Sequence, residues 1–455
     1  MKASQAESEK MLKWWELSLL GVGCIIGTGF FLGSSIAIQM AGPSVLLAFI
    51  LAGIGTYIVF DALAQMTSAD PEKGSFRSYA KKAYGRWAGF TSGWVYWASE
   101  MLIMGSQLTA LSIFSRFWFP DVPLWIFASG FAVLGIIVIL TGSKGFDRIE
   151  NLFAVMKVAA IVMFIALAIL ALFGVFRAGP EGAGIPRTWN GLFPEGFLGL
   201  WPALIFGFYA FGGIEIMGLL ANRLEEKGDA AKSGRAMLLL LTFLYVVSVG
   251  LALILVPLNR FNTETSPFIT ALKPYGLPIV SHLFNGVLII AGFSTMVASL
   301  FAVTSILVTL AADKDAPNLF AKKVKNKIAL PAIGLTAIGM ALSVVLSLLI
   351  PGRIYEYFTT AAGLMLLYNW LFIIASSGKL IQYSLTKRWI GTLFILLAVI
   401  GTLFHRTSRP GFLFSLGFLV VIGIVTLMMK KRWKQEEGDG KKRPSIFVKL
   451  KPNSE

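Results

Sequence analysis

Long runs of hydrophobic residues alternate with short polar segments along the whole chain. A membrane-spanning helix needs about 20 apolar residues, whereas a strand of a membrane barrel shows about 10 residues of alternating polarity. The runs here are unbroken, so they predict helices. The first six predicted spans are Leu17–Met40, Ser44–Thr67, Trp87–Trp118, Leu124–Gly142, Asn151–Phe176 and Leu198–Asn222. The second six are Met237–Val256, Pro278–Ala312, Pro331–Ile350, Ile354–Ser376, Trp389–Phe404 and Gly411–Met429.

The composition supports an all-α integral membrane protein with twelve transmembrane helices. Hydrophobic residues make up 56% of the 455 residues and charged residues only 14%. Soluble domains carry about 25% charged residues, so too few polar side chains remain to coat a water-soluble globule. The single cysteine, Cys24, lies in an apolar run, and the two histidines are far apart in the sequence. We therefore expect no disulfide, no metal site and no cofactor.

The positive charges indicate how the chain is oriented. If the N-terminus is cytoplasmic, 32 of the 40 Lys and Arg residues fall on the cytoplasmic side, as the positive-inside rule requires. Residues 1–16 then form a cytoplasmic N-terminal segment and residues 431–455 a basic cytoplasmic tail. The net charge of +16 is therefore an orientation signal that can also contact anionic membrane lipids, and no nucleic-acid partner is expected.

Two clusters of glycine interrupt the first and sixth predicted spans. The first cluster is Ile26-Gly27-Thr28-Gly29, and the second lies within Phe211-Gly212-Gly213-Ile214-Glu215. The clusters are five spans apart, so spans one to five and six to ten must enter the membrane from opposite sides. This arrangement predicts an inverted repeat, with residues 17–176 and 198–376 as its halves, and a substrate site at the broken helices. The alternative is that the glycines only allow close helix packing.

Four ionisable residues lie within the predicted spans. Placing a charged side chain inside the membrane costs free energy, so each of them is expected to have a structural or functional role. Glu215 follows the second break by two residues, so it either faces the predicted cavity or binds the free amides of the broken helix. Lys157 is either functional or reaches back to the cytoplasmic surface. Glu100 lies mid-span and is a candidate for substrate or proton binding. Asp61 is interpreted as an interhelical hydrogen-bonding residue.

Five segments resemble amino acid permeases of the amino acid–polyamine–organocation superfamily. Ile26 to Phe31 resembles the first-helix motif IGxGIF, and Phe211 to Glu215 with Gly218 resembles the sixth-helix motif F-x-G-x-E. The long signature between the second and third helices is matched by Pro71 to Ala80, Gly85, Gly89-Phe90 and Gly93 to Trp97. Lys157 and the segment Ala312 to Pro317 match further family positions.

The resemblance implies roles for the matching residues. The backbone at Ile26, Gly27, Thr28 and Gly29 would bind the substrate carboxylate, and carbonyls around Phe211, Gly212 and Ile214 would bind its ammonium group. Tyr209 would be an aromatic gate, and Glu100 and Met104 would line the side-chain pocket. Lys157 would stand where sodium-coupled relatives of the fold bind a cation, so Lys157 and Glu215 are the candidates for proton coupling.

The chain departs from the family pattern at Arg223, Gln107 and Gln65, where relatives often carry a carboxylate, and at Glu100. Glu100 could pair with a basic substrate or, when protonated, hydrogen-bond a neutral one. The prediction is a secondary transporter of the cell membrane that carries an amino acid inward with protons and performs no enzymatic reaction. The alternatives are an amino acid exchanger or a membrane sensor that binds an amino acid without moving it. The substrate and the oligomeric state are not predicted.

Overall fold

The structure is a computed structural model, and it describes residues 11–72, 74–140, 143–176, 188–322, 329–349 and 354–440. Within these ranges the regular structure is helical, without a β-strand. The helices of the first half are α1 (Trp14–Ile25), α2 (Thr28–Phe31), α3 (Gly33–Ala41), α4 (Val45–Ala69), α5 (Phe76–Tyr84), α6 (Arg86–Ser115), α7 (Leu124–Leu140), α8 (Ser143–Leu172) and α9 (Trp189–Leu192). Those of the second half are α10 (Gly196–Ala210), α11 (Ile214–Leu220), α12 (Ala230–Leu255), α13 (Pro267–Leu272), α14 (Pro278–Ala312), α15 (Leu330–Leu349), α16 (Ile354–Leu380), α17 (Leu385–Phe404) and α18 (Arg409–Gly440).

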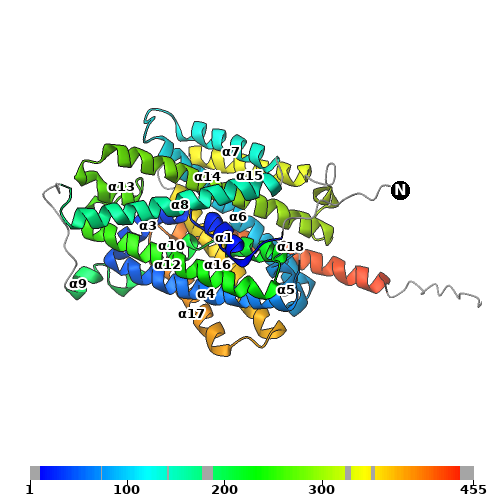
Figure 1. Cartoon of the computed structure of the whole chain (residues 1–455). Coiled ribbons are helices and arrows are strands. Elements are labelled where there is room, and N and C mark those ends of the chain that lie inside the picture. Colours follow the sequence, from blue (N-terminus) through cyan, green and yellow to red (C-terminus); the bar gives the residue numbers. More distant parts are fainter. Residues whose placement is uncertain are drawn as a thin grey trace, which may run out of the picture.

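Most of the long helices run roughly parallel to one another and form a single bundle (Figure 1). In the described part of the chain, eight helical stretches are long and apolar enough to cross a membrane, and α1, α7 and most of α15 are shorter apolar helices. This finding confirms a multi-span membrane protein. Helix α6, the third predicted span, is not among the eight because Glu100, Gln107 and many Ser and Thr residues lower its hydropathy.

The first and sixth predicted spans are both interrupted at their glycine clusters. Helix α1 ends at Ile25, and the chain passes through Ile26 and Gly27 before α2 begins. Helix α10 ends at Ala210, and α11 begins after Gly213. Helix α10 lies in the middle of the bundle and packs against α3, α4, α16 and α17. Both interruptions are therefore surrounded by other helices, where exposed backbone groups can line a cavity.

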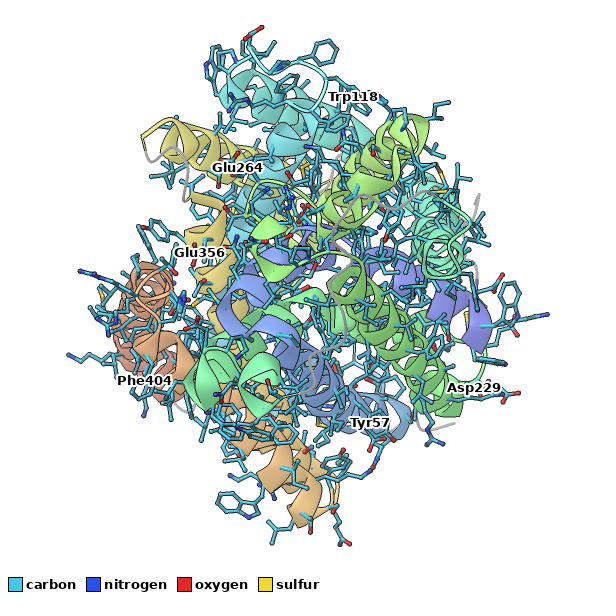
Figure 2. All side chains as sticks on the ribbon, turned by 90° about the vertical axis from the view of Figure 1, so that its left-hand side faces the viewer. Tyr57, Trp118, Asp229, Glu264, Glu356 and Phe404 are labelled. Atoms are coloured by element: carbon cyan, nitrogen blue, oxygen red, sulfur yellow. The ribbon has the colours of Figure 1, made fainter. Side chains whose placement is uncertain are left out.

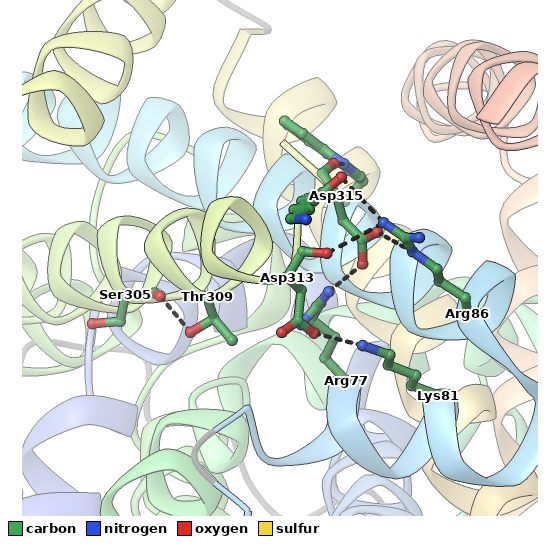
Figure 3. A network of polar contacts seen from close by, with 9 residues as sticks. Arg77, Lys81, Arg86, Ser305, Thr309, Asp313 and Asp315 are labelled. Atoms are coloured by element: carbon green, nitrogen blue, oxygen red, sulfur yellow. Dashed lines mark hydrogen bonds and ion pairs between the residues drawn. The ribbon is translucent and has the colours of Figure 1, made fainter. Parts of the chain in front are cut away.

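The end of the bundle that carries α5 is held together by ion pairs, of which the pair of Arg77 with Asp315 is fully buried (Figure 3). The Arg77 guanidinium lies 2.9 Å from an Asp313 oxygen and 2.5 Å from an Asp315 oxygen. Arg86 binds the other oxygen of Asp315 at 2.9 Å, and Lys81 binds Asp313 at 2.9 Å. These contacts join α5 and the start of α6 to the segment that follows α14.

Two further polar contacts join distant segments near the same end. The amide of Leu12 donates to the carbonyl of Arg223 at 2.7 Å, and the amide of Glu225 donates to the carbonyl of Leu12 at 3.0 Å. The chain just before α1 is thereby paired with the chain that follows α11. Asp61 accepts hydrogen bonds from Tyr383 at 2.9 Å and Lys387 at 2.8 Å, so it links α4 to α17 as an interhelical residue.

The predicted terminal segments are only partly described. Residues 1–10 of the N-terminal segment and 441–455 of the basic tail lie outside the described residues. The described part of the tail continues α18, which extends beyond the bundle at the right of Figure 1.

Candidate functional site

A small cavity of about 30 Å³ lies between the two helix breaks. Its walls come from four parts of the bundle: the first break, α6, the second break and α14. The residues that line it are Cys24, Ile25, Gly27, Thr28, Gly29, Glu100, Ile103, Gln107, Tyr209, Gly212, Gly213, Ile216, Thr295 and Ser299. Backbone from both interruptions therefore faces one space, together with the middle of α6 and α14.

The first break presents the start of a helix to this cavity. The first N–H groups of a helix have no partner within it and favour a negatively charged group. Here the amides of Phe30 and Phe31 turn back to the Gly27 carbonyl at 3.1 and 3.0 Å, which begins α2. A Cβ atom at Gly29 would lie only 2.7 Å from the Tyr209 ring, so glycine is required for this close approach.

The second break presents the end of a helix. Gly213 has φ +115°, a conformation that side-chain-bearing residues rarely adopt. Helix α10 stops at Ala210, whose carbonyl accepts a hydrogen bond from Tyr245 at 3.1 Å. The last carbonyls of a helix carry partial negative charge and favour a cation. The cavity thus has the start of the four-residue helix α2 on one wall and the chain that follows α10 on another.

Tyr209 covers the cavity. Its hydroxyl forms a 2.5 Å hydrogen bond with Ser106 of α6, and the side chain is almost completely buried. Along α6, Ser106 lies between Ile103, which lines the cavity, and Thr109, which lines a larger space beyond it. Tyr209 and Ser106 therefore meet at the junction between the two spaces.

The larger space is a vestibule of about 830 Å³ at the end of the bundle opposite α5. Its walls include Glu264, Glu356, Arg116, Thr109 and Tyr355. Figure 2 views this end of the molecule and shows Glu264 and Glu356 near each other on it. The Tyr355 hydroxyl donates to the carbonyl of Thr28 at 2.9 Å, which forms a second contact between vestibule and cavity.

Lys157 is fully buried in α8 and does not reach the surface. Its ammonium group donates to the Gly23 carbonyl of α1 and, at 2.7 Å, to the Ser294 hydroxyl of α14. The lysine therefore holds three helices together directly behind the first break. The alternative that its side chain extends back to the membrane surface does not apply.

Glu215 turns toward the helix break rather than the cavity. One carboxylate oxygen accepts the Gly213 amide at 3.2 Å, and the other accepts the indole N–H of Trp370. Glu215 is not among the residues that line the cavity. The sequence left two alternatives for Glu215. In the structure its carboxylate binds a backbone amide of the broken helix.

Glu100 is placed in the cavity wall, whereas Met104 is not. Glu100 is 1% exposed and lines the cavity, with Ser299 and Tyr96 facing its carboxyl group. Met104, four residues later, packs with Leu108, Leu111 and Met296 in a separate hydrophobic cluster. The side chains of Ile26, Phe211 and Ile214 belong to the main hydrophobic core, so only their backbone can serve a ligand.

Several lining residues did not emerge from the sequence as site residues. Ile103 and Gln107 share the cavity-facing side of α6 with Glu100, and a helical spacing of three or four residues could have identified them. Thr295 and Ser299 come from α14, whose sequence carries no glycine break to mark it. In the described residues, no group of three or more His, Cys, Asp or Glu side chains could hold a metal ion.

Comparison with known proteins gives a consistent result. Residues 16–435 match the family model described as amino acid permease. The uncharacterized transporter YcgH of Bacillus subtilis (strain 168) is 58% identical over 92% of this chain and 95% of its own length. The uncharacterized amino acid permease YtnA of the same organism is 30% identical over 83% of this chain and 82% of its own. The aromatic amino acid transport protein AroP of Salmonella typhimurium (strain SL1344) is 31% identical over 82% of each chain.

Proposed function

The chain belongs to the amino acid permease family, and on this premise we propose that it is a secondary active transporter that moves an amino acid by alternating access. The observation that carries the proposal is the cavity itself. Residues of both helix breaks line one small cavity, and Tyr209 lies between this cavity and the vestibule. An amino acid has a negative carboxylate and a positive ammonium group, so it matches both helix ends at once.

The proposed architecture has twelve spans. Helices α1 to α3 would form the first span and α10 with α11 the sixth, so the breaks fall at equivalent positions of two inverted repeats, residues 17–176 and 198–376. Helices α17 and α18 would supply the last two spans, within residues 389–430, before the tail of residues 431–455. The charge distribution supports a cell-membrane protein with both termini in the cytoplasm.

The proposed binding mode uses backbone groups. The amides at Ile26, Gly27, Thr28 and Gly29 would receive the carboxylate of the substrate. The carbonyls around Phe211, Gly212 and Ile214 would receive its ammonium group. Tyr209 would close over the bound amino acid, and the side chain of the substrate would extend toward Glu100 and α6. In this arrangement Met104 would support the pocket from beside the cavity wall, because it packs against Leu108, Leu111 and Met296.

Alternating access is supported by the difference between the two ends of the bundle. The vestibule lies at one end of the bundle, and the hydrogen bonds of Tyr209 with Ser106 and of Tyr355 with Thr28 lie between it and the cavity. At the other end, Leu12 is bonded to the chain after α11, which holds the cytoplasmic ends of both broken helices together. Under the proposed orientation this is an outward-facing arrangement with its gate closed. Release of the Leu12 contacts would open the cytoplasmic side.

Proton coupling is proposed to run through Lys157, with Glu215 as its partner at the second break. A protonated Lys157 binds Gly23 and Ser294 and fixes α1 against α14; a neutral amine would bind them less strongly and release α1. Glu215 holds Gly213 in its conformation, so a change in its charge would act on the second break. Protons and the amino acid would then be co-transported inward.

Purified protein in liposomes tests this function. We expect labelled amino acid to accumulate when the outside is made acidic, and Lys157→Met to lose this response while keeping exchange of internal for external substrate. Uptake that follows a sodium gradient and ignores a pH gradient would overturn proton coupling. Transport that requires internal substrate would identify an exchanger, and saturable binding without any flux would identify a sensor.

A further inference from the structure

Glu100 has an acceptor atom that the protein leaves unused. Its side chain is 1% exposed, and it is the one Asp, Glu, Lys or Arg residue among those that line the cavity in the described structure. Its Oε2 atom is buried without a hydrogen-bond partner among the described groups, with the hydroxyls of Ser299 and Tyr96 facing the carboxyl group. A buried carboxylate oxygen without a hydrogen bond is unfavourable, and most buried polar atoms in proteins are paired.

Two further unpaired atoms face the same cavity. Gln107 Oε1 and Thr28 Oγ1 are buried, and neither has a hydrogen-bond partner in the part of the chain that the structure describes. Both residues line the cavity with Glu100. A carboxylate and an amide carbonyl only accept hydrogen bonds, so the missing group is a donor. These three atoms are additional to the backbone groups proposed to bind the ends of the amino acid.

The route to the cavity is also acidic. Glu264 and Glu356 line the vestibule, and Glu356 Oε1 is a buried atom without a partner in the described structure. The Arg116 guanidinium lies in the same wall, where it binds the Pro120 carbonyl at 3.1 and 3.2 Å. Carboxylates along a cleft attract cations and raise their local concentration. The vestibule and the cavity therefore favour the same sign of charge.

We propose that Glu100 selects a substrate whose side chain is positively charged, as in lysine or arginine. This inference rests on the proposed function and deepens it by naming the substrate class. A cationic side chain would donate hydrogen bonds to Glu100, with Gln107 and Thr28 as additional partners, and would neutralise the buried carboxylate. A neutral side chain of the same size would leave Glu100 unpaired or protonated, so the charge decides the selection.

The test compares amino acids of matched shape in counterflow, with protein in liposomes and unlabelled amino acids as competitors of labelled lysine. Norleucine has the length of lysine without its charge, and citrulline resembles arginine without its charge. We expect lysine and arginine to compete at least about 30-fold better than norleucine and citrulline, as a buried charge pair requires. Glu100→Gln should remove most of this preference, whereas Glu226→Gln, at an exposed carboxylate that lines neither the cavity nor the vestibule, should leave the preference unchanged.

Each outcome has a defined meaning. If norleucine competes as well as lysine, or if the preference for lysine survives in Glu100→Gln, the role of Glu100 is refuted. If labelled lysine is not transported but labelled leucine or phenylalanine is, the cationic substrate is refuted while the transport function stands. If none of the twenty amino acids is exchanged by a folded protein, the proposed function itself fails. The wild-type comparison stands even if Glu100→Gln does not fold.

Discussion

The hydroxyl of Tyr209 lies 2.5 Å from the hydroxyl of Ser106, and this contact joins the broken sixth span to the unbroken helix α6. The ring of the same tyrosine packs against Gly29 of the first break. One side chain thus touches both broken helices and the helix that carries Glu100. Under the proposed function, a substrate that enters from the vestibule would displace this contact before it reaches the cavity.

Loss of the Tyr209 hydroxyl should weaken the closed gate without disturbing the fold. A single hydrogen bond contributes about 0.5–1.5 kcal/mol, so Tyr209→Phe should release bound substrate about 3- to 10-fold faster. Dissociation of labelled amino acid from the purified protein measures this rate. Tyr368→Phe is the matched control, because Tyr368 contacts Ser415 at 3.3 Å in α18, away from the cavity. Equal release rates in the wild type and Tyr209→Phe would exclude the hydroxyl as a latch.

A methyl group at Gly29 should prevent Tyr209 from closing. Its Cβ atom would lie 2.7 Å from the ring, closer than atoms of this kind normally approach. We expect Gly29→Ala to reduce substrate affinity more than about tenfold, and Tyr209→Leu in the same chain to restore part of it. Binding isotherms for the two single variants and the double variant provide the measurement. Gly130→Ala is the control, since the space around Gly130 is open. Additive losses in the double variant would show that the two residues act independently.

The ion pairs around Asp315 should make a large contribution to stability. Arg77 and Asp315 are both buried, and Arg86 binds the same carboxylate. Removing one partner of a buried pair leaves the other charge unpaired and costs about 3–5 kcal/mol. Asp315→Asn should therefore lower the melting temperature in detergent by several degrees. Lys82→Met removes a half-exposed contact with Asp70 and Glu72, which contributes about 1 kcal/mol or less. This variant should leave the melting temperature nearly unchanged. Equal melting temperatures for both variants would contradict the buried network.

The same network predicts a dependence of stability on pH. Burial raises the pKa of Asp313, but hydrogen bonds from Lys81 and Arg77 outweigh it and hold the pKa below its ordinary value of 3.8. A lowered pKa in the folded state adds stability that is present above the unfolded value and is lost as the pH falls through the folded one. The difference in melting temperature between the wild type and Lys81→Met should be constant from neutral pH down to about pH 5 and shrink below about pH 4. A difference that grows on acidification would contradict this assignment.

The helix breaks could be predicted from the sequence, because glycine clusters act locally. Gly213 needs a positive φ, and Gly29 needs the absence of a side chain; both requirements are visible as residue types. The direction of Glu215 was open because a carboxylate two residues beyond a break can reach either the cavity or the backbone amide. Only the packing of Trp370 against it determines which one it reaches.

For the cavity wall on α6, too, the sequence does not determine which side chains face the cavity. Met104 and Gln107 follow Glu100 by about one and two helical turns, and they lie on opposite sides of the line that runs through Glu100 along the helix. The rotation of α6 decides which of them meets the cavity, and that rotation depends on contacts with α14 and α16, which come from the other half of the chain. Residue spacing therefore identifies α6 and the face that carries Glu100. Tertiary packing determines which neighbouring side chain on that face lines the cavity.

Cys24, the single cysteine of the chain, gives the most direct test of the central claim that the amino acid is carried through this cavity. A small thiol reagent is added to protein in liposomes, and the rate of Cys24 modification is measured with and without a transported amino acid. The account predicts that saturating substrate slows modification at least about tenfold, while an amino acid that is not transported has no effect. An unchanged rate under conditions where the same amino acid is being transported would contradict it.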